Sequence, residues 1–259
     1  MSGEIHKTAI VSAKAEIADS VSIGPFCIIG DGVTIKKGTR LISNVVIEGN
    51  TEIGDHCTIY PFATIGLPPQ DLKYKNEKTG VKIGKRNVIR EYASIHRASV
   101  GGDGLTEIGD SNFIMGYVHI AHDCKIGSSV AMANAATLAG HVTVEDFAFI
   151  GGVVAIHQFA RIGAYSMVGG FSGIAQDIPP YTMASGARAK LYGLNVIGLK
   201  RHGFSDEAIN NLKKAYKILF REKRTLQDAL KSIKAELSGT PEVDRLVEFI
   251  EQNKRGICR

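Results

Sequence analysis

The sequence predicts a mainly β protein, in which a parallel β-helix of hexapeptide repeats is followed by a C-terminal α-helical domain. An aliphatic residue recurs at every sixth position through most of residues 11–174. This period fits neither an α-helix nor a long flat strand, but it is typical of a parallel β-helix. The repeat ends at DIPPY, residues 177–181, because adjacent prolines cannot donate to a strand ladder. We expect a β-helical domain over residues 1–189 and a helical domain over residues 190–259.

The repeat runs in three blocks, residues 11–65, 83–95 and 108–174, which together hold 25 aliphatic positions. Three steps of six residues make one triangular turn. The aliphatic residue and the small residue two positions before it fill the interior, and the glycine that often follows relieves a corner with positive φ. Three cysteines, Cys27, Cys57 and Cys124, occupy the small position. We expect them to be buried reduced thiols, because no CxxC pair indicates a metal or redox site.

Two segments interrupt the repeat. From Ile65 to Ile83 the chain advances 18 residues, so this segment could replace strands while the phase is kept. From Ile95 to Ile108 the phase shifts by one residue, so that segment must loop out. Loops on a rigid solenoid are natural binding elements.

Three helices are expected after the prolines. Ser205 precedes two acidic residues, Thr225 precedes Asp228, and Thr240-Pro241 opens a third helix, all of which are N-terminal signals. Residues 1–189 carry 16 Lys and Arg against 17 Asp and Glu, whereas residues 190–259 carry 15 against 9. The basic helical domain is either a solvated surface or one that attracts an acidic partner or a phosphate-bearing substrate. It has no basic motif interleaved with aromatic residues, so nucleic acid is not an expected partner.

The N-terminus lacks the basic start and continuous apolar core of a secretory signal, and the longest apolar run, residues 147–156, is too short to span a membrane. We expect a cytoplasmic protein with no integral membrane segment. Apolar residues that point outward from the coil need cover, and a homotrimer would place clefts between subunits, each lined by two chains. These residues are Phe113, Tyr117, Phe147, Phe149 and Tyr165.

The stretch GYVHIAHDCKIG, residues 116–127, contains two histidines and an aspartate. Residues 18 apart stack in adjacent turns, so His122 should lie below Gly140 and Asp123 below His141. His119 belongs to the same patch and His157 borders it. A lone outward histidine on such a coil is usually just a solvent-exposed side chain. A cluster of histidines is less readily explained in this way.

Two chemical hypotheses compete for this patch. His119, His122 and His141 could hold zinc, as in carbonic anhydrases built on this kind of coil, provided that the three rings converge. Alternatively, His122 is a general base whose imidazolium is stabilised by Asp123, and the bare Gly140 amide faces a developing oxyanion. The second hypothesis favours acyl transfer. It favours direct attack by the acceptor, since no serine or cysteine stands out as a covalent nucleophile.

The ordered motifs of the whole chain resemble a known family, the acyl-carrier-protein-dependent UDP-N-acetylglucosamine O-acyltransferases, which catalyse the first committed step of lipid A synthesis. The motifs are QDLKY (70–74), IHR (95–97), HIAHDC (119–124), LAGHV (138–142), HQF (157–159), AQDIPPY (175–181) and GLKRHGF (198–204). The resemblance implies a left-handed coil, a homotrimer, 3-hydroxyacyl carrier protein as donor and UDP-N-acetylglucosamine as acceptor, with no cofactor and no metal.

The resemblance also implies roles for individual residues. His122 would deprotonate the glucosamine 3-hydroxyl, Asp123 would stabilise it, and Gly140 would donate its N–H to the tetrahedral intermediate. Glycine at position 170 would leave room for a long acyl chain. The remaining expected substrate contacts are Gln70, Asp71, Lys73, His96, His119, His141, His157 and Gln158 at the sugar and acyl sites, and Asn195 and Arg201 at the nucleotide end.

Alternatives to this activity come from the same coil and from another class of protein. The N-acyltransferase acting two steps later in the pathway carries a separate uridine-binding N-terminal domain, and a repeat that begins at Val11 leaves no room for one. An acceptor with an amine at C3 stays open. An ice-binding scaffold would show a flat Thr-x-Thr face, whereas the outward residues here are chemically mixed.

Overall fold

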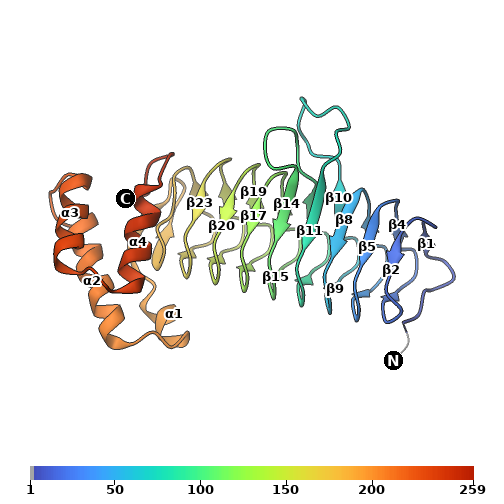
Figure 1. The fold of residues 1–259 in the computed structure, drawn as a ribbon, viewed down its shortest axis with the longest axis horizontal. Coiled ribbons are helices and arrows are strands. Elements are labelled where there is room, and N and C mark those ends of the chain that lie inside the picture. Colours follow the sequence, from blue (N-terminus) through green and yellow to red (C-terminus); the bar gives the residue numbers. More distant parts are fainter. Residues whose placement is uncertain (1–2) are drawn as a thin grey trace.

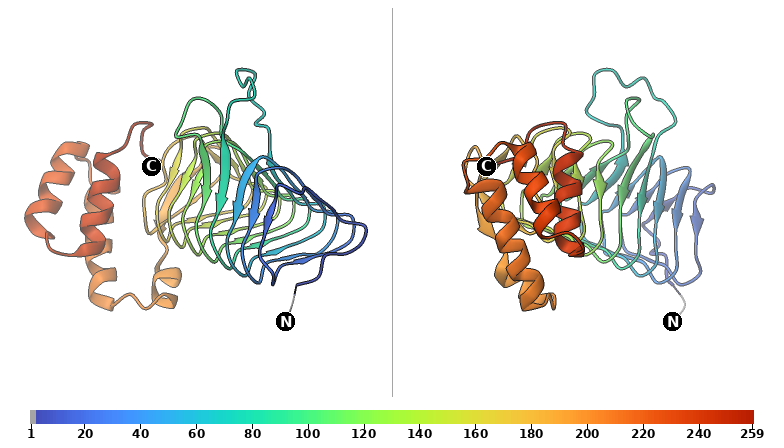
Figure 2. Two further views of the ribbon diagram at one scale, coloured as in Figure 1. Left: turned by 45° about the vertical axis from the view of Figure 1, so that its right-hand side comes forward. Right: turned by 60° about the vertical axis from the view of Figure 1, so that its left-hand side comes forward.

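The computed structural model describes residues 3–259 and shows a triangular prism capped at its C-terminal end by helices (Figure 1). The prism is a left-handed coil whose three faces are parallel β-sheets, as Figure 2 shows obliquely. As far as Ile174, consecutive strands along the chain lie on consecutive faces, and successive strands of one sheet are three positions apart along the chain. The last two strands, Thr182–Ser185 and Lys190–Leu194, both join the third face, the final one antiparallel. The predicted fold class is confirmed.

The three sheets are numbered by their first strand. Sheet 1 contains β1 (Ile10–Val11), β4 (Ile28–Ile29), β7 (Val46–Ile47), β10 (Thr64–Leu67), β13 (Ser94–His96), β16 (His119–Ile120), β19 (Thr137–Leu138), β22 (Ala155–Ile156) and β25 (Gly173–Ile174). Sheet 2 contains β2 (Glu16–Ile17), β5 (Val33–Ile35), β8 (Asn50–Ile53), β11 (Gly80–Ile83), β14 (Leu105–Ile108), β17 (Lys125–Ile126), β20 (Thr143–Val144) and β23 (Arg161–Ile162). Sheet 3 contains β3 (Ser22–Ile23), β6 (Arg40–Leu41), β9 (Thr58–Ile59), β12 (Val88–Ile89), β15 (Phe113–Ile114), β18 (Ala131–Met132), β21 (Phe149–Ile150), β24 (Met167–Val168), β26 (Thr182–Ser185) and β27 (Lys190–Leu194).

The register places aliphatic residues on aliphatic residues along the whole prism. Ile29 pairs with Ile47, and the match continues across both insertions, where Ile65 pairs with Ile95 and Ile95 with Ile120. These residues are buried, so the interior is a continuous column of aliphatic side chains. Cys27, Cys57 and Cys124 are fully buried free thiols inside that column, as predicted.

Two loops project from the same corner, between sheet 1 and sheet 2 (Figure 1). The long loop, residues 68–79, joins β10 to β11, and the short loop, residues 97–104, joins β13 to β14. The sequence suggested that the first insertion could stand in for strands of the coil while keeping its phase. Instead, β10 and β11 lie on consecutive faces, so residues 68–79 are an added loop and no strand position is skipped. The second insertion loops out as predicted.

The repeat glycines act differently from the expectation. Positive φ falls on the third residue after the aliphatic position, such as Phe26, Asp123 and His141. Of the glycines that directly follow the aliphatic position, Gly66 alone has a positive φ within the described residues. A Cβ at Gly24 would lie 1.7 Å from the Ile42 carbonyl oxygen, in the next turn. The glycine is therefore needed for close approach of neighbouring turns, and not for its backbone dihedral angles.

Four helices follow the coil: α1 (Val196–Arg201), α2 (Asp206–Phe220), α3 (Leu226–Glu236) and α4 (Pro241–Glu251). The last three begin where predicted, with Ser205 and Thr225 accepting hydrogen bonds from backbone amides. The short α1 was not predicted. The expected boundary at residue 189 falls between β26 and β27, which pair antiparallel within sheet 3. Among residues 3–259, no helix is both long and apolar enough to cross a membrane.

Part of the outward apolar surface is covered within the chain itself. Phe147 and Tyr165 stack at 4.7 Å between ring centroids, and the His202 ring packs edge-on against both of them. Tyr117 stays 61% exposed, and Phe113 and Phe149 are more than a third exposed. Of the five predicted residues, Phe113, Tyr117 and Phe149 therefore lack cover in a single chain.

Candidate active site

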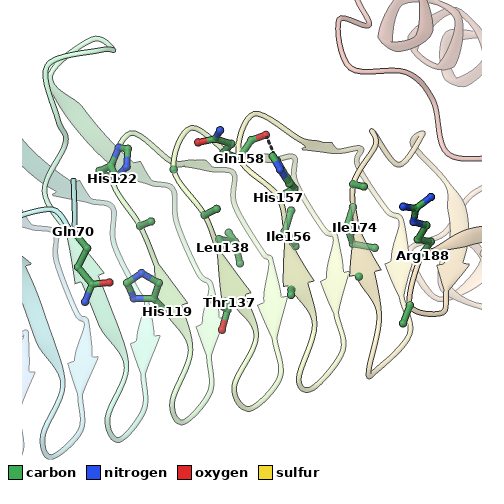
Figure 3. A pocket seen from close by; sticks show the side chains of 17 residues that line it. Gln70, His119, His122, Thr137, Leu138, Ile156, His157, Gln158, Ile174 and Arg188 are labelled. Atoms are coloured by element: carbon green, nitrogen blue, oxygen red, sulfur yellow. Dashed lines mark hydrogen bonds between the residues drawn. The ribbon is translucent and has the colours of Figure 1, made fainter. Parts of the chain in front are cut away.

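A cavity of about 690 Å³ lies over sheet 1 and its corner with sheet 2. Figure 3 shows its labelled side chains on successive turns, from Gln70 and His122 at one end to Arg188 at the other. The floor between them is made by small and aliphatic residues, among them Leu138, Ile156 and Ile174. The cavity therefore joins a polar, histidine-rich end to an apolar groove.

The His122 and Asp123 side chains form a hydrogen-bonded pair at the polar end. Nδ1 of His122 lies 2.8 Å from Oδ2 of Asp123, whose side chain is 3% exposed. Asp123 turns the corner with a φ of +58°, and its own N–H donates to Thr106 Oγ1 at 2.9 Å. Its Oδ2 also accepts from the Ser99 N–H at 3.0 Å. A buried carboxylate fixed in this way orients the imidazole and stabilises its protonated form.

The imidazole of His122 lies directly against Gly140 of the next turn. A Cβ at Gly140 would lie 2.4 Å from Cε1 and 2.6 Å from Nε2 of that ring. The predicted stacking of His122 on Gly140 in the next turn is confirmed, because the His141 N–H of that turn also donates to the His122 carbonyl oxygen at 3.0 Å. Within residues 3–259 no acceptor takes the Gly140 N–H, so this amide is available to a ligand beside the imidazole.

His141 completes the cluster from the far side of Asp123. Its Nε2 lies 3.8 Å from Asp123 Oδ2, and its ring stacks on Phe159 at 4.6 Å between centroids. His157 and Gln158 are exposed on the following turn and line the cavity, as expected.

His119 and His96 occupy the neighbouring turns of sheet 1. His119 lines the cavity and shares a 2.8 Å hydrogen bond between its Nδ1 and Ser94 Oγ. Burial, helped by His122, lowers the pKa of His119. His96 is only 7% exposed and packs edge-on against His119 rather than lining the cavity. Burial lowers the pKa of His96 to about 4, with smaller contributions from His119 and His122, so this ring is neutral at pH 7.

The long loop brings one of its three predicted residues to the cavity. Gln70 lines it, whereas Lys73 is exposed on the loop and does not. Asp71 accepts a 2.6 Å hydrogen bond from Ser99 Oγ of the short loop, and this bond is the main cause that holds the pKa of Asp71 below its usual range.

Three predicted substrate contacts lie elsewhere in the single chain. Gly170 lies between β24 and β25, on the corner of sheets 3 and 1. Asn195 caps α1, accepting from the Gly198 N–H and donating to the Tyr165 carbonyl oxygen. Arg201 lies in the last turn of α1. None of the three lines the cavity.

No sequence pattern pointed to the residues that support the cluster. Ser94 bonds His119, and Ser99 and Thr106 fix Asp123. Ser94 reaches His119 through the pairing of β13 with β16, Thr106 lies in β14, and Ser99 is brought to Asp123 by the short loop.

A metal would find a different ligand set from the expected one. The atoms that converge within 4.8 Å belong to His122, Asp123 and His141, without His119. Zinc bonds of about 2.0–2.1 Å in tetrahedral geometry hold ligand atoms about 3.3 Å apart. The 2.8 Å between His122 Nδ1 and Asp123 Oδ2 is instead a hydrogen-bond distance. The residues therefore fit a charge-stabilised base better than a zinc centre.

Comparison with known proteins identifies the relatives of this chain. The family model described as "Udp N-acetylglucosamine O-acyltransferase; Domain 2" matches residues 177–258, and the model "Bacterial transferase hexapeptide (six repeats)" matches residues 32–67. The acyl-[acyl-carrier-protein]--UDP-N-acetylglucosamine O-acyltransferase of Thermodesulfovibrio yellowstonii is 73% identical over 99% of both chains. That of Syntrophobacter fumaroxidans is 53% identical over 99% of this chain and 100% of the other.

A solved structure agrees with these relatives. The UDP-N-acetylglucosamine acyltransferase of Francisella novicida is 40% identical and superposes with a TM-score of 0.97, covering 99% of this chain and 94% of the other. Identity of this extent along both chains, together with the shared fold, shows that this chain belongs to the acyl-carrier-protein-dependent UDP-N-acetylglucosamine O-acyltransferase family.

Proposed function

We propose that this protein transfers a 3-hydroxyacyl chain from acyl carrier protein to the glucosamine 3-position of UDP-N-acetylglucosamine, the first step of lipid A biosynthesis. The observation that carries the proposal is the placement of one imidazole between two complementary groups. His122 has a buried carboxylate bonded to its Nδ1, and its Cε1–Nε2 edge lies against the bare backbone of Gly140, whose N–H is not taken by an acceptor within residues 3–259.

The reaction proceeds by direct attack of the acceptor. Nε2 of His122 takes the proton from the 3-hydroxyl as its oxygen attacks the thioester carbonyl carbon, and Asp123 stabilises the resulting imidazolium. The tetrahedral oxyanion accepts a hydrogen bond from the Gly140 N–H. Collapse of this intermediate breaks the carbon–sulfur bond, and the imidazolium returns its proton to the departing pantetheine thiolate.

Covalent catalysis by cysteine is disfavoured by the same surroundings. Cys124 follows Asp123 in the sequence, but its Sγ points inward and lies 3.2 Å from the Ala139 carbonyl oxygen. Burial raises the pKa of the Cys124 thiol to about 12. A thiol that stays protonated at neutral pH is a poor nucleophile, so a ternary complex is favoured over an acyl-enzyme.

The acyl chain would occupy the apolar groove between His122 and Arg188, and Gln70 and His157 would contact the sugar. Gly170, Asn195 and Arg201 would contact the substrate in a homotrimer, the assembly expected from the sequence, if a second subunit covers the cavity. Exposed aromatic residues that need such cover stack along the corner between sheets 3 and 1. They are Phe62, Tyr92 and Tyr117, with ring centroids 5.0 and 4.8 Å apart.

The basic helical domain offers a surface for the acidic carrier protein. We also propose the cytoplasm as the location of the reaction, as the sequence predicted.

The decisive experiment replaces the base. His122→Ala should keep the trimer, as measured by size-exclusion chromatography with light scattering. It should lose nearly all transfer from 3-hydroxyacyl carrier protein to UDP-N-acetylglucosamine, because His122 is the cavity imidazole whose protonated form a buried carboxylate stabilises. Residual activity within tenfold of wild type would remove His122 as the base. The same assay with a panel of acyl-chain lengths, and with acceptors carrying a hydroxyl or an amine at C3, identifies the preferred donor chain and the acceptor group.

A further inference from the structure

Ser99 connects two parts of the site that lie on different loops and strands. It belongs to the short loop and is 1% exposed. Its hydroxyl donates to Asp71 Oδ2 of the long loop at 2.6 Å, and its backbone N–H donates to Asp123 Oδ2 at 3.0 Å. One buried residue therefore binds both the Asp71 carboxylate, for which the family resemblance implies a substrate contact, and the Asp123 carboxylate that supports the base.

The long loop depends on the short loop for its position. Asp71 Oδ1 accepts only from the Lys73 N–H of its own loop, at 2.9 Å. The other side-chain hydrogen bond between the two loops runs from Arg97 Nε to the Tyr74 hydroxyl at 3.0 Å. The Ser99–Asp71 contact lies one residue from Gln70, which lines the cavity, and a hydrogen bond to an ionised carboxylate is stronger than one between neutral groups.

The short loop also closes over the buried side of Asp123. A Cβ at Gly102 would lie 2.4 Å from Asp123 Oδ1, so the loop backbone packs tightly on this carboxylate. On its other side Asp123 is held through its own N–H by Thr106, which is fully buried. The loop therefore fixes Asp123, and through it the imidazole of His122.

We propose that Ser99 is a positioning residue, which holds Asp71 of the acceptor-binding loop and the Asp123 carboxylate in one fixed arrangement. This inference rests on the proposed function. The Ser99 hydroxyl fixes Asp71 and thereby the position at which the acceptor binds. The Ser99 N–H fixes the Asp123 carboxylate and thereby the orientation of the His122 imidazole. Together these contacts place the acceptor hydroxyl within reach of His122. Small misplacements of reacting groups are costly in catalysis.

The hydrogen bond that holds Asp71 and the hydrogen bonds that hold Asp123 should affect different kinetic parameters. Ser99→Ala removes the hydroxyl but keeps the amide, so the KM for UDP-N-acetylglucosamine should rise about tenfold, while kcat stays within about threefold of wild type. Ser99→Thr should restore the KM because it restores the donor. Thr106→Val should do the opposite, lowering kcat about tenfold with little change in KM, because it frees the Asp123 backbone. Val100→Ala, an exposed change on the same loop, is the matched control.

A double-mutant cycle shows whether the hydroxyl acts through Asp71. In an Asp71→Ala background, Ser99→Ala should raise the KM no further. An additive effect, or a Ser99→Ala enzyme with wild-type KM, would overturn the proposal. Ser99→Cys keeps the size with a weaker donor and gives the same test should the alanine variant fail to fold. Activity in His122→Ala would refute the proposed base without changing this cycle, so the two failures are distinguishable.

Discussion

Gly140→Ala tests whether the imidazole needs its place against the next turn. A Cβ at this position would lie 2.4 Å from Cε1 of His122, whereas ordinary contacts begin at 3.4 Å. The ring must therefore retreat by about 1 Å, which strains its 2.8 Å hydrogen bond to Asp123. Misplacement on this scale costs on the order of 100-fold in rate, or about 2.7 kcal/mol of transition-state stabilisation.

The measurement is the steady-state rate of acyl transfer, with carrier protein and acceptor each varied. We expect kcat to fall about 100-fold while the trimer and its thermal midpoint change little, because the substitution touches only an outward ring. Gly30→Ala is the matched control. It is a repeat glycine far from the cavity, where a Cβ would meet its nearest neighbour at 3.4 Å, and it should be fully active. A Gly140→Ala enzyme within threefold of wild type would refute the assigned geometry.

Three further predictions concern stability and metal. Folded His96 resists protonation down to about pH 4, so stability present above pH 6.5 should be lost as the pH falls from 6.5 to 4, by up to about 3 kcal/mol per chain. Urea unfolding of wild type and His96→Gln between pH 7 and 4.5 checks this, and parallel pH dependences would contradict it. Gly54→Ala should lower the thermal midpoint well below that of Gly30→Ala, because its Cβ would lie 2.5 Å from the Gly84 backbone; equal midpoints would disprove the close-approach role of the repeat glycines. Treatment with EDTA should leave the transfer rate unchanged, since the base needs no metal, and a rate that falls and returns with added zinc would revive the zinc hypothesis.

Most of the architecture could be read from the sequence because a solenoid converts sequence distance into spatial distance. Once three steps of six residues form a turn, residues 18 apart must stack, and His122 must meet Gly140. The same rule placed the cysteines inside and gave the expectation of a surface histidine cluster. Local capping signals at Ser205 and Thr225 located two of the helices for an equally local reason.

Only the tertiary structure determined the contacts that the six-residue repeat does not specify. Ser99 holds Asp123 because the short loop folds back on the prism, and Thr106 holds it from the neighbouring strand β14. The role of the repeat glycines depends on the distance between adjacent turns, which is a tertiary contact and is not visible in the sequence of one turn. Gly170 lies away from the cavity in one chain because it is on another corner of the prism, and Asn195 and Arg201 do so because they belong to α1 and its N-cap. The sequence by itself thus determined which residues stack, and only the tertiary structure decided which of them are fixed, buried or brought together, because hydrogen bonds and burial depend on contacts between segments far apart along the chain.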